Sequence, residues 1–251
     1  MVSIGDLLTQ QELTSLLEIQ YHAMKSTTET ELKGLLLRIG RLVPAEYIVT
    51  CLGRTDPNGK FQDFVRLINC SYPSSWIDRY VKENYAQIDP VLQTNFGNFK
   101  TQIWSETSRQ ASGAQKVFLD EAQGCGLSDG ITVGMASLRH STGSLFSFSG
   151  PQISENIRHA LLLEYLVPHL HMVLTRTCFP PKSREAPFLT KREKEVLQWI
   201  KEGKTNWEIG QILGISERTS KFHVQNIASK FDASNRSHVV ALAMDLELIE
   251  P

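Results

Sequence analysis

Hydrophobic residues in the first third of the chain follow two different spacings. Apolar positions recur every three or four residues over 7–17 and again over 32–42, which predicts two amphipathic helices. The segments Tyr47–Leu52 and Phe61–Tyr72 are instead rich in β-branched and aromatic residues, and a Thr-Asp-Pro-Asn-Gly run between them is a strong turn signal. This part of the chain is therefore predicted to form two helices followed by a β-hairpin.

A second group of strands and a long helix follow. Ile131–Leu138 and Leu145–Phe148 are predicted strands on either side of a turn, and Ser154–Thr175 is a predicted helix with Ser154 as its N-cap. Shorter helical segments lie between the two groups of strands. Helices mixed with antiparallel strands predict an α+β fold, in the form of an N-terminal α-β-α sandwich with a central antiparallel sheet.

The composition changes between positions 177 and 187. Three prolines stand there among charged and polar residues, which is typical of a semi-extended linker. We therefore expect an N-terminal domain over residues 1–176, a linker over residues 177–187 and a C-terminal domain over residues 188–251.

Beyond the linker every pattern is helical. Four helices are expected, and the first two begin with a capping box, in which a threonine is followed three residues later by a glutamate. The third helix extends to about Phe231, and the fourth begins near Ser234 or Asn235. The predicted N-caps of the first three helices are Thr190, Thr205 and Ser216. The C-terminal domain is thus predicted to be an all-α four-helix domain.

A short glycine turn joins the second and third of these helices. The sequence Leu213-Gly214-Ile215-Ser216 has the length and the glycine that a helix-turn-helix requires. That geometry places the third helix in the major groove of DNA. Charge alone favours an ordinary solvated helix instead, because residues 187–251 contain nine basic and nine acidic residues. A basic bias is confined to the third helix.

The full C-terminal string decides between these interpretations. Residues 189–231 closely resemble the LuxR-type DNA-binding domain, which implies that the third helix binds double-stranded DNA. Lys221 and Gln225 match positions that face the groove floor, whereas Thr205 and Lys230 are expected nearer to phosphates. The residues expected at the DNA are Thr205, Ser216, Arg218, Thr219, Lys221, Gln225, Asn226 and Lys230.

One position departs from that family. Ser220 stands where valine is usual, on the side that faces the interior of the domain. A buried hydroxyl without a partner costs about 1–3 kcal/mol. We therefore expect the Ser220 hydroxyl to bond back to a carbonyl in the preceding turn of its helix.

A sparse set of aromatic and acidic residues in the N-terminal half resembles the autoinducer-binding domain of the same regulators. The set is Tyr72-Pro73, Trp76, Tyr80, Asp89-Pro90 and Trp104, at the spacing of that family. Taken singly, each aromatic residue is as readily explained as part of the core. A buried carboxylate among them favours a ligand site, because an unpaired charge in an apolar environment is costly.

The resemblance implies a pocket for an N-acyl-homoserine lactone. A carboxylate accepts N–H groups and an indole only donates, so Asp89 is expected to accept the ligand's amide N–H. Trp76 is expected to donate to the lactone carbonyl and Tyr72 to the acyl carbonyl. Tyr80 and Trp104 are expected to form aromatic walls around the ring.

The last predicted strand supplies a further ligand residue. Ser147 matches a family position whose hydroxyl reaches the acyl carbonyl. By strand alternation, residues in phase with the end of Phe61–Tyr72 share its face and should line the acyl channel or its mouth. These residues are Phe64, Arg66, Ile68 and Cys70. Two positions depart from the family pattern. Gly134 stands where many relatives carry proline, and the glycine usual just before the last strand is either Gly143, slightly displaced, or is replaced by Ser144. Because both positions lie in the sheet beside the pocket, the preferred acyl chain stays open.

The resemblance identifies the chain as a ligand-responsive transcription regulator of quorum sensing and not as an enzyme. The sequence has no P-loop, nucleophile elbow or metal-ligand cluster, and its four cysteines are too widely spaced for a zinc or dithiol motif. No cofactor is expected besides the lactone ligand. Two alternatives stay open: a ligand-blind orphan regulator, and an anti-activator that heterodimerises with a related regulator.

Location and partners follow from the same interpretation. The N-terminus lacks the basic start and apolar run of a signal peptide, and no apolar stretch is long enough to span a bilayer, so a cytoplasmic protein without membrane contact is expected. RNA polymerase is a further candidate partner.

A homodimer on a two-fold symmetric DNA site is expected, because one short recognition helix makes few contacts. The long helix Ser154–Thr175 is one candidate dimer seam, and the last helix is another. The residues of that second seam are Val239, Val240, Ala243 and Leu246. The alternative is that both helices pack inside their own domains.

Overall fold

The structure, a computed structural model, describes residues 7–137, 141–180, 186–246 and 248–249. The chain forms two compact units, Met1–Pro181 and Lys182–Pro251.

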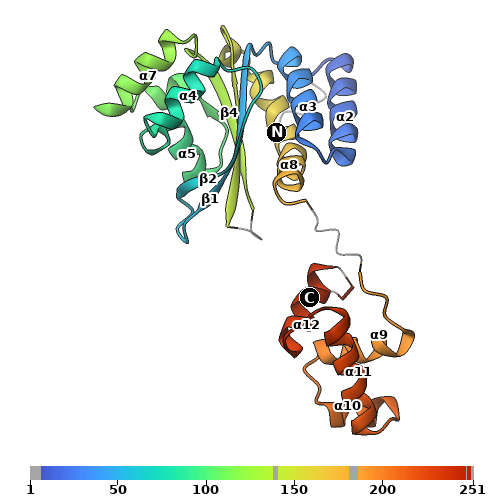
Figure 1. Ribbon diagram of the computed structural model, residues 1–251. Helices are drawn as coiled ribbons and strands as arrows, with labels where there is room; N and C mark the ends of the chain where they lie inside the picture. Colours follow the sequence, from blue (N-terminus) through green and yellow to red (C-terminus); the bar gives the residue numbers. More distant parts are fainter. Residues whose placement is uncertain (1–6, 138–140, 181–185, 247, 250–251) are drawn as a thin grey trace. The chain divides into compact units, whose positions relative to one another are not determined.

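A five-stranded sheet forms the centre of the N-terminal unit (Figure 1). Its strands are β1 Tyr47–Thr55, β2 Phe61–Asn69, β3 Gln102–Ile103, β4 Gly130–Ser137 and β5 Thr142–Ser149. They lie in the order β2-β1-β5-β4-β3, and every neighbouring pair is antiparallel. The sequence did not predict β3, because two residues are too few to give an alternating pattern. Leu138, the expected last residue of the third predicted strand, lies outside the described residues.

Helices cover both faces of this sheet (Figure 1). One face carries α2 Gln10–Lys25, α3 Glu29–Leu42 and α8 Ile157–Cys178. The other face carries α4 Ser74–Lys82, α5 Pro90–Asn98, α6 Trp104–Ser108 and α7 Ala114–Gly124. Two single 3-10 turns, η1 Tyr85–Gln87 and η2 Ile153–Glu155, complete the described elements of this unit. Each helical layer has its own buried apolar core against the sheet, which confirms the predicted α-β-α sandwich.

The long helix begins later than the sequence predicted. Its N-cap is Asn156, whose side chain accepts the backbone N–H of Arg158 at 3.1 Å. Ser154 lies in η2, where its own N–H donates to Asp129 at 3.1 Å. Ser154 as N-cap is therefore wrong. The leucine-rich side of α8 packs against the core below α2 and α3, so that side is not available as a dimer seam.

The C-terminal unit consists of four described helices around one core. They are α9 Lys191–Lys201, α10 Asn206–Leu213, α11 Glu217–Lys230 and α12 Arg236–Asp245. The N-caps of the first three are Thr190, Thr205 and Ser216, as the sequence predicted, and Asn235, one of the two expected starts, caps the fourth. Gly214 ends α10 with a φ of 67°, a left-handed conformation that glycine adopts without strain. The turn therefore reverses the chain within three residues and confirms the helix-turn-helix.

The last helix does not offer the expected dimer seam. Val239 and Ala243 are fully buried inside their own unit, and Val240 and Leu246 pack against the same core. A short amphipathic helix has one apolar face, and the core of the four-helix unit occupies it. Packing inside the domain therefore accounts for Val239 and Ala243, whereas Val240 and Leu246 stay half-buried.

The hydroxyl of Ser220 does not bond as expected. The residue is fully buried, and among the described residues its Oγ has no hydrogen-bond partner. Only its backbone N–H bonds to the preceding turn, donating to the carbonyl of Ser216 at 2.9 Å. The side-chain bond predicted from the sequence is wrong, and the hydroxyl is a local cost of about 1–3 kcal/mol to the unit.

Candidate functional site

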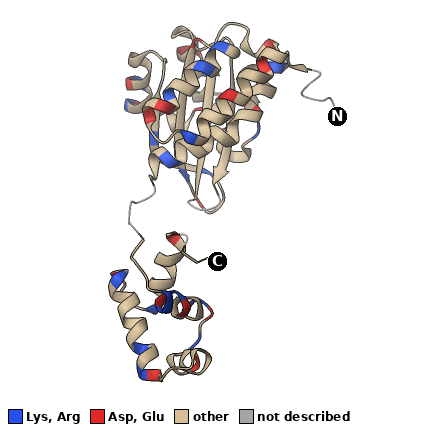
Figure 2. Ribbon diagram, turned by 90° about the vertical axis from the view of Figure 1, so that its right-hand side faces the viewer, with Lys and Arg blue, Asp and Glu red and all other residues tan. Residues whose placement is uncertain are grey.

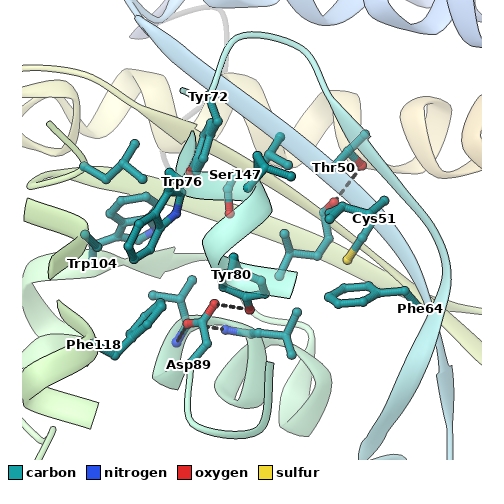
Figure 3. Close-up of a pocket in the computed structure, with 18 of the residues that line it drawn as sticks. Thr50, Cys51, Phe64, Tyr72, Trp76, Tyr80, Asp89, Trp104, Phe118 and Ser147 are labelled. Atoms are coloured by element: carbon teal, nitrogen blue, oxygen red, sulfur yellow. Dashed lines mark hydrogen bonds between the residues drawn. The ribbon is translucent and has the colours of Figure 1, made fainter. Parts of the chain in front are cut away.

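A pocket lies between the sheet and the layer of α4, α5 and α7 in the N-terminal unit (Figure 3). Its cavity volume is about 80 Å³. Most of its walls are aliphatic or aromatic, with a few polar groups among them. Six of the eight expected ligand residues line it: Tyr72, Trp76, Tyr80, Asp89, Trp104 and Ser147.

The start of α5 holds the carboxylate of Asp89 in place. Asp89 precedes Pro90 as the N-cap, and its Oδ1 accepts the backbone N–H groups of Val91 at 2.8 Å and Leu92 at 3.2 Å. Its Oδ2 accepts the hydroxyl of Tyr80 at 2.8 Å. A carboxylate offers about four lone-pair sites. Three bonds therefore leave one site on Asp89 for an N–H donor inside the pocket.

Opposing effects act on the ionisation of this pair. Burial raises the pKa of Asp89, and the hydrogen bonds from Tyr80 and from the start of α5 act against that increase. Burial, together with the nearby carboxylate, raises the pKa of Tyr80 well above its ordinary value. Tyr80 is thus a neutral donor, and its bond favours the charged, accepting form of Asp89.

A second polar chain crosses the pocket floor on β4 and β5. The indole N–H of Trp104 donates to Oγ1 of Thr132 at 2.8 Å, and the hydroxyls of Thr132 and Ser147 lie 2.7 Å apart. The Thr132 oxygen already accepts from Trp104, so its own hydrogen can donate to Ser147. In that arrangement the Ser147 hydrogen is free to donate into the pocket. Trp104 thus has a hydrogen-bonding role in addition to the aromatic wall predicted from the sequence.

Two further donors at the pocket have no partner. Among the described residues, none forms a hydrogen bond with the hydroxyl of Tyr72 or the indole N–H of Trp76, although both residues are buried. Figure 3 shows both side chains at the pocket. Burial raises the pKa of Tyr72, which keeps its hydroxyl neutral. Neither donor atom is among the fully buried polar atoms without a partner, so both are accessible from the pocket and available to a ligand that carries acceptors.

Two expected ligand residues lie on the other face of the sheet. The guanidinium of Arg66 pairs with Glu29 of α3 at 2.6 Å. Ile68 packs into the core below α2, α3 and α8, and Cys70 contacts that same core. Neither Arg66 nor Ile68 lines the pocket. The sequence-based placement of these residues on the acyl channel is therefore wrong, whereas Phe64 does line it.

The alternation used for that prediction is interrupted twice. β2 ends at Asn69, whose side chain bonds to the backbone of Tyr72 in a turn, so the phase of Tyr72 does not extend into the strand. Within β2 the register shifts, because Arg66 pairs with Leu52 whereas Phe64 pairs with the next residue of β1. Such a β-bulge adds one unpaired residue and reverses the alternation beyond it.

Sequence reasoning missed several residues of the site. Thr132 pairs directly with Ser147 in the β4–β5 hairpin, and that hairpin register was the signal that could have identified it. Phe118 and Ala122 of α7 form one wall of the pocket, and Cys51 of β1 forms another. The sequence predicted these as helix and strand residues without placing them at a ligand site.

Metal and membrane features are not found in the described part of the chain. No group of three or more His, Cys, Asp or Glu residues there is arranged to hold a metal ion. None of the described helices is both long and apolar enough to cross a bilayer.

The exposed face of α11 carries the candidate DNA-reading side chains. Arg218, Lys221 and Gln225 are exposed and spaced by three and four residues, so they share one face of the helix. Figure 2 shows Lys and Arg interspersed with Asp and Glu in both units. α11 itself has a positive bias, because Glu217 is its single acidic residue against three basic ones.

Four other expected DNA residues lie at or near this helix pair. The side chain of Thr205 caps α10. Ser216 caps α11 by accepting the N–H of Thr219 at 3.1 Å, and the two hydroxyls lie 2.8 Å apart. Asn226 is half-buried on α11. These helix N-termini present backbone N–H groups, which suit contact with phosphate.

Lys230 is engaged inside its own unit. Its ammonium donates to Oε2 of Glu193 at 2.7 Å and to the carbonyl of Phe188 at 3.1 Å. Burial alone would raise the pKa of Glu193, but bonds from Lys230 and Thr190 outweigh it and hold that pKa below its ordinary value. This geometry gives Lys230 a role in the stability of the unit, and its expected contact with a DNA phosphate stays a prediction.

Replacing Lys230 by methionine is expected to destabilise the C-terminal unit. Lys230→Met retains the apolar stem but leaves the buried Glu193 with fewer donors, which should lower the unfolding free energy by about 1–3 kcal/mol. Hydrogen exchange of α9 and α11 in the full-length protein measures this loss, with Lys194→Met on exposed α9 surface as the control. A Lys230→Met variant with native protection but weaker affinity for all DNA sequences would instead support the phosphate contact.

Two family models match the chain. Residues 28–174 match the autoinducer binding domain. Residues 187–243 match the bacterial regulatory proteins of the luxR family.

Similar curated proteins are regulators. The chain is 37% identical over 183 residues to the quorum sensing-dependent transcriptional regulator RpaR of Rhodopseudomonas palustris, covering 71% of this chain and 73% of that protein. It is 32% identical over 188 residues to the quorum-sensing regulator RhlR of Pseudomonas aeruginosa, covering 72% and 76%.

Solved structures of similar fold include Escherichia coli SdiA. One SdiA structure matches with a TM-score of 0.54 and 28% identity over 96% of this chain and 98% of that one. SdiA in complex with octanoyl-rac-glycerol matches with a TM-score of 0.55 and 26% identity, covering 98% of this chain and 97% of that one.

Proposed function

Because the chain belongs to the LuxR family of quorum-sensing transcriptional regulators, we propose that its autoinducer-binding unit takes an N-acyl-homoserine lactone. We further propose that the bound lactone controls DNA binding by the helix-turn-helix unit. The first proposal concerns the identity of the ligand and the second its effect.

The arrangement of hydrogen-bonding groups in the pocket carries the ligand proposal. One lone-pair site of Asp89 is available to an N–H, while Trp76 and Tyr72 are donors that need acceptors. An acyl-homoserine lactone supplies one amide N–H, an acyl carbonyl and a lactone carbonyl, followed by an apolar chain. Its polar atoms therefore match the donors and acceptor of the pocket, and its chain matches the apolar walls.

The roles of the pocket residues follow from this match. Asp89 accepts the amide N–H, Trp76 donates to the lactone carbonyl, and Tyr72 and Ser147 donate to the acyl carbonyl. Tyr80 orients Asp89 by its 2.8 Å hydrogen bond. Trp104 orients Ser147 through Thr132 and also packs against the ligand.

For the DNA-binding unit we propose a homodimer on a two-fold symmetric site. Arg218, Lys221 and Gln225 read base edges from the exposed face of α11, because lysine, arginine and glutamine side chains recognise purines in the major groove. Thr205, Ser216, Thr219 and Asn226 contact the backbone. Pairing two such units supplies the contacts that one short helix lacks.

One observation favours a ligand-blind regulator as the second candidate. Asp89 and Ser147 already have partners within the protein, so an empty pocket leaves fewer buried groups unsatisfied than the sequence alone suggested. In that case the fingerprint residues would serve only to pack the unit.

Co-purification decides between the two candidates. The full-length protein, expressed in cells supplied with a panel of acyl-homoserine lactones and then purified, is expected to retain a lactone in about equimolar amount, detected by mass spectrometry of the denatured sample. Asp89→Asn should retain much less, because it lacks the charged acceptor. Soluble native protein that retains none of the lactones would support the ligand-blind candidate.

A further inference from the structure

Four phenylalanines form a continuous cluster at one end of the ligand layer. The ring centres of Phe61 and Phe64 lie 4.9 Å apart, those of Phe61 and Phe96 also lie 4.9 Å apart, and Phe96 and Phe99 are 5.5 Å apart. Phe61 and Phe64 belong to β2, whereas Phe96 lies in α5 and Phe99 at its end. We call this cluster the phenylalanine plug, because it joins the edge of the sheet to α5.

The plug rests directly on the backbone of the sheet. A Cβ added to Gly53 would lie 2.6 Å from the Phe61 ring, and one added to Gly143 would lie 2.4 Å from the Phe99 ring. Only glycine permits so close an approach. Beside them, a Cβ on Gly134 would lie 2.4 Å from the Asn95 amide oxygen of α5. α5 and the phenylalanine rings are therefore in close contact with the sheet at these positions.

Phe64 is the member of the plug that borders the pocket. In Figure 3 it lies with Cys51 at the end away from Trp104 and Phe118. Asp89 and Ser147, which carry hydrogen-bonding groups of the site, lie between Phe64 and Trp104 in this view. A ligand whose polar head binds those groups therefore extends its tail toward Phe64.

We propose that the phenylalanine plug makes this protein a receptor for short acyl chains, with Phe64 as the residue that limits chain length. This inference rests on the proposed lactone-binding function. Methylenes that fit the apolar wall before Phe64 add affinity, because each is removed from water. Methylenes beyond Phe64 meet closely packed rings and must displace them, since packed interiors do not absorb extra volume without strain. The preferred ligands are thus butanoyl- and hexanoyl-homoserine lactone, and dodecanoyl-homoserine lactone is disfavoured.

The test measures the chain-length profile of the full-length protein. Native and variant proteins are expressed with graded amounts of butanoyl-, hexanoyl- or dodecanoyl-homoserine lactone. For each lactone, the readout is the lactone concentration that gives half of the maximal increase in soluble, thermally stabilised protein. The native protein should need at least about tenfold more dodecanoyl than hexanoyl lactone. Phe64→Ala should lower that ratio by about tenfold or more, because the pocket then extends into the space of the removed ring.

Val65→Ala is the matched control, because Val65 lies next to Phe64 on β2 but packs against the opposite core. It should reduce stability without changing the ratio. If Phe64→Ala does not fold, Phe64→Leu provides a smaller truncation with the same expected direction. Equal responses of the native protein to hexanoyl and dodecanoyl lactone, or equal ratios for the Phe64 and Val65 variants, would overturn the inference while leaving lactone binding intact. No response to any of the three lactones in any variant would overturn the proposed function itself.

Discussion

Asp89→Asn is expected to raise the concentration of lactone needed for half-maximal response at least about tenfold. The amide retains one oxygen that can cap α5, but its other polar group is an NH2 that cannot accept, so the charge-assisted hydrogen bond to the ligand's N–H is lost. Hydrogen bonds to charged groups contribute about 1.5–3 kcal/mol, which corresponds to roughly one to two orders of magnitude in affinity. Dose–response of a reporter gene, or of soluble protein yield, measures the shift.

The choice of asparagine separates ligand binding from folding. Asparagine is as good an N-cap as aspartate, so the bonds from Val91 and Leu92 persist and the unliganded unit should keep nearly its native stability. Asp89→Ala, which removes the cap as well, is the comparison that shows both losses together. A dose–response for Asp89→Asn that coincides with the native curve would contradict a ligand contact at this carboxylate.

A pH series adds an independent criterion. Burial raises the pKa of Asp89, and only the ionised carboxylate provides the charged acceptor. Lactone affinity should therefore be full above the pKa of Asp89 and fall as the pH drops through it. The affinity of Asp89→Asn should show no such fall, because its amide does not titrate in this range.

Local signals in the sequence predicted the starts of the first three C-terminal helices. The capping boxes at Thr190 and Thr205 are complete within four residues, and the bonds that they imply are all present. The position of Asp89 was predictable for the same reason, since Asp-Pro defines both an N-cap and the first turn of a helix. These features depend on contacts between near neighbours in the chain, which a sequence pattern records directly.

Features that depend on distant partners were not predictable. The β-bulge that turns Arg66 toward Glu29 depends on how β2 pairs with β1, and alternation within one strand carries no sign of it. The bond between Lys230 and Glu193 joins positions 37 residues apart. A lysine at the end of a recognition helix gives no local indication of whether it pairs with DNA or with its own domain. The bond to Glu193 is visible only in the packed structure.

A bound lactone is expected to stabilise the N-terminal unit strongly. A ligand that binds only the folded state adds RT ln(1 + [L]/Kd), about 2.7 kcal/mol at a hundredfold excess over Kd. For a unit of this size that corresponds to an increase of roughly 5–10 °C in melting temperature. The structural origin is the pair of unpartnered donors on Tyr72 and Trp76 and the unfilled apolar pocket, both of which a lactone would satisfy. Thermal unfolding of the full-length protein with and without hexanoyl-homoserine lactone measures the shift.

Hydrogen exchange locates this stabilisation within the chain. Because the two units have separate cores, added lactone should increase protection in α4, α5 and β5 and leave α9 and α10 unchanged when DNA is absent. The C-terminal unit thus serves as the internal control for any general effect of the ligand on the solution. Order gained in the N-terminal unit would then favour assembly of the dimer, so DNA affinity should rise with lactone even though α11 is unaltered. Protection that rises equally in both units would point to a nonspecific effect, and a protein that binds its operator with no change in either unit would support the ligand-blind candidate.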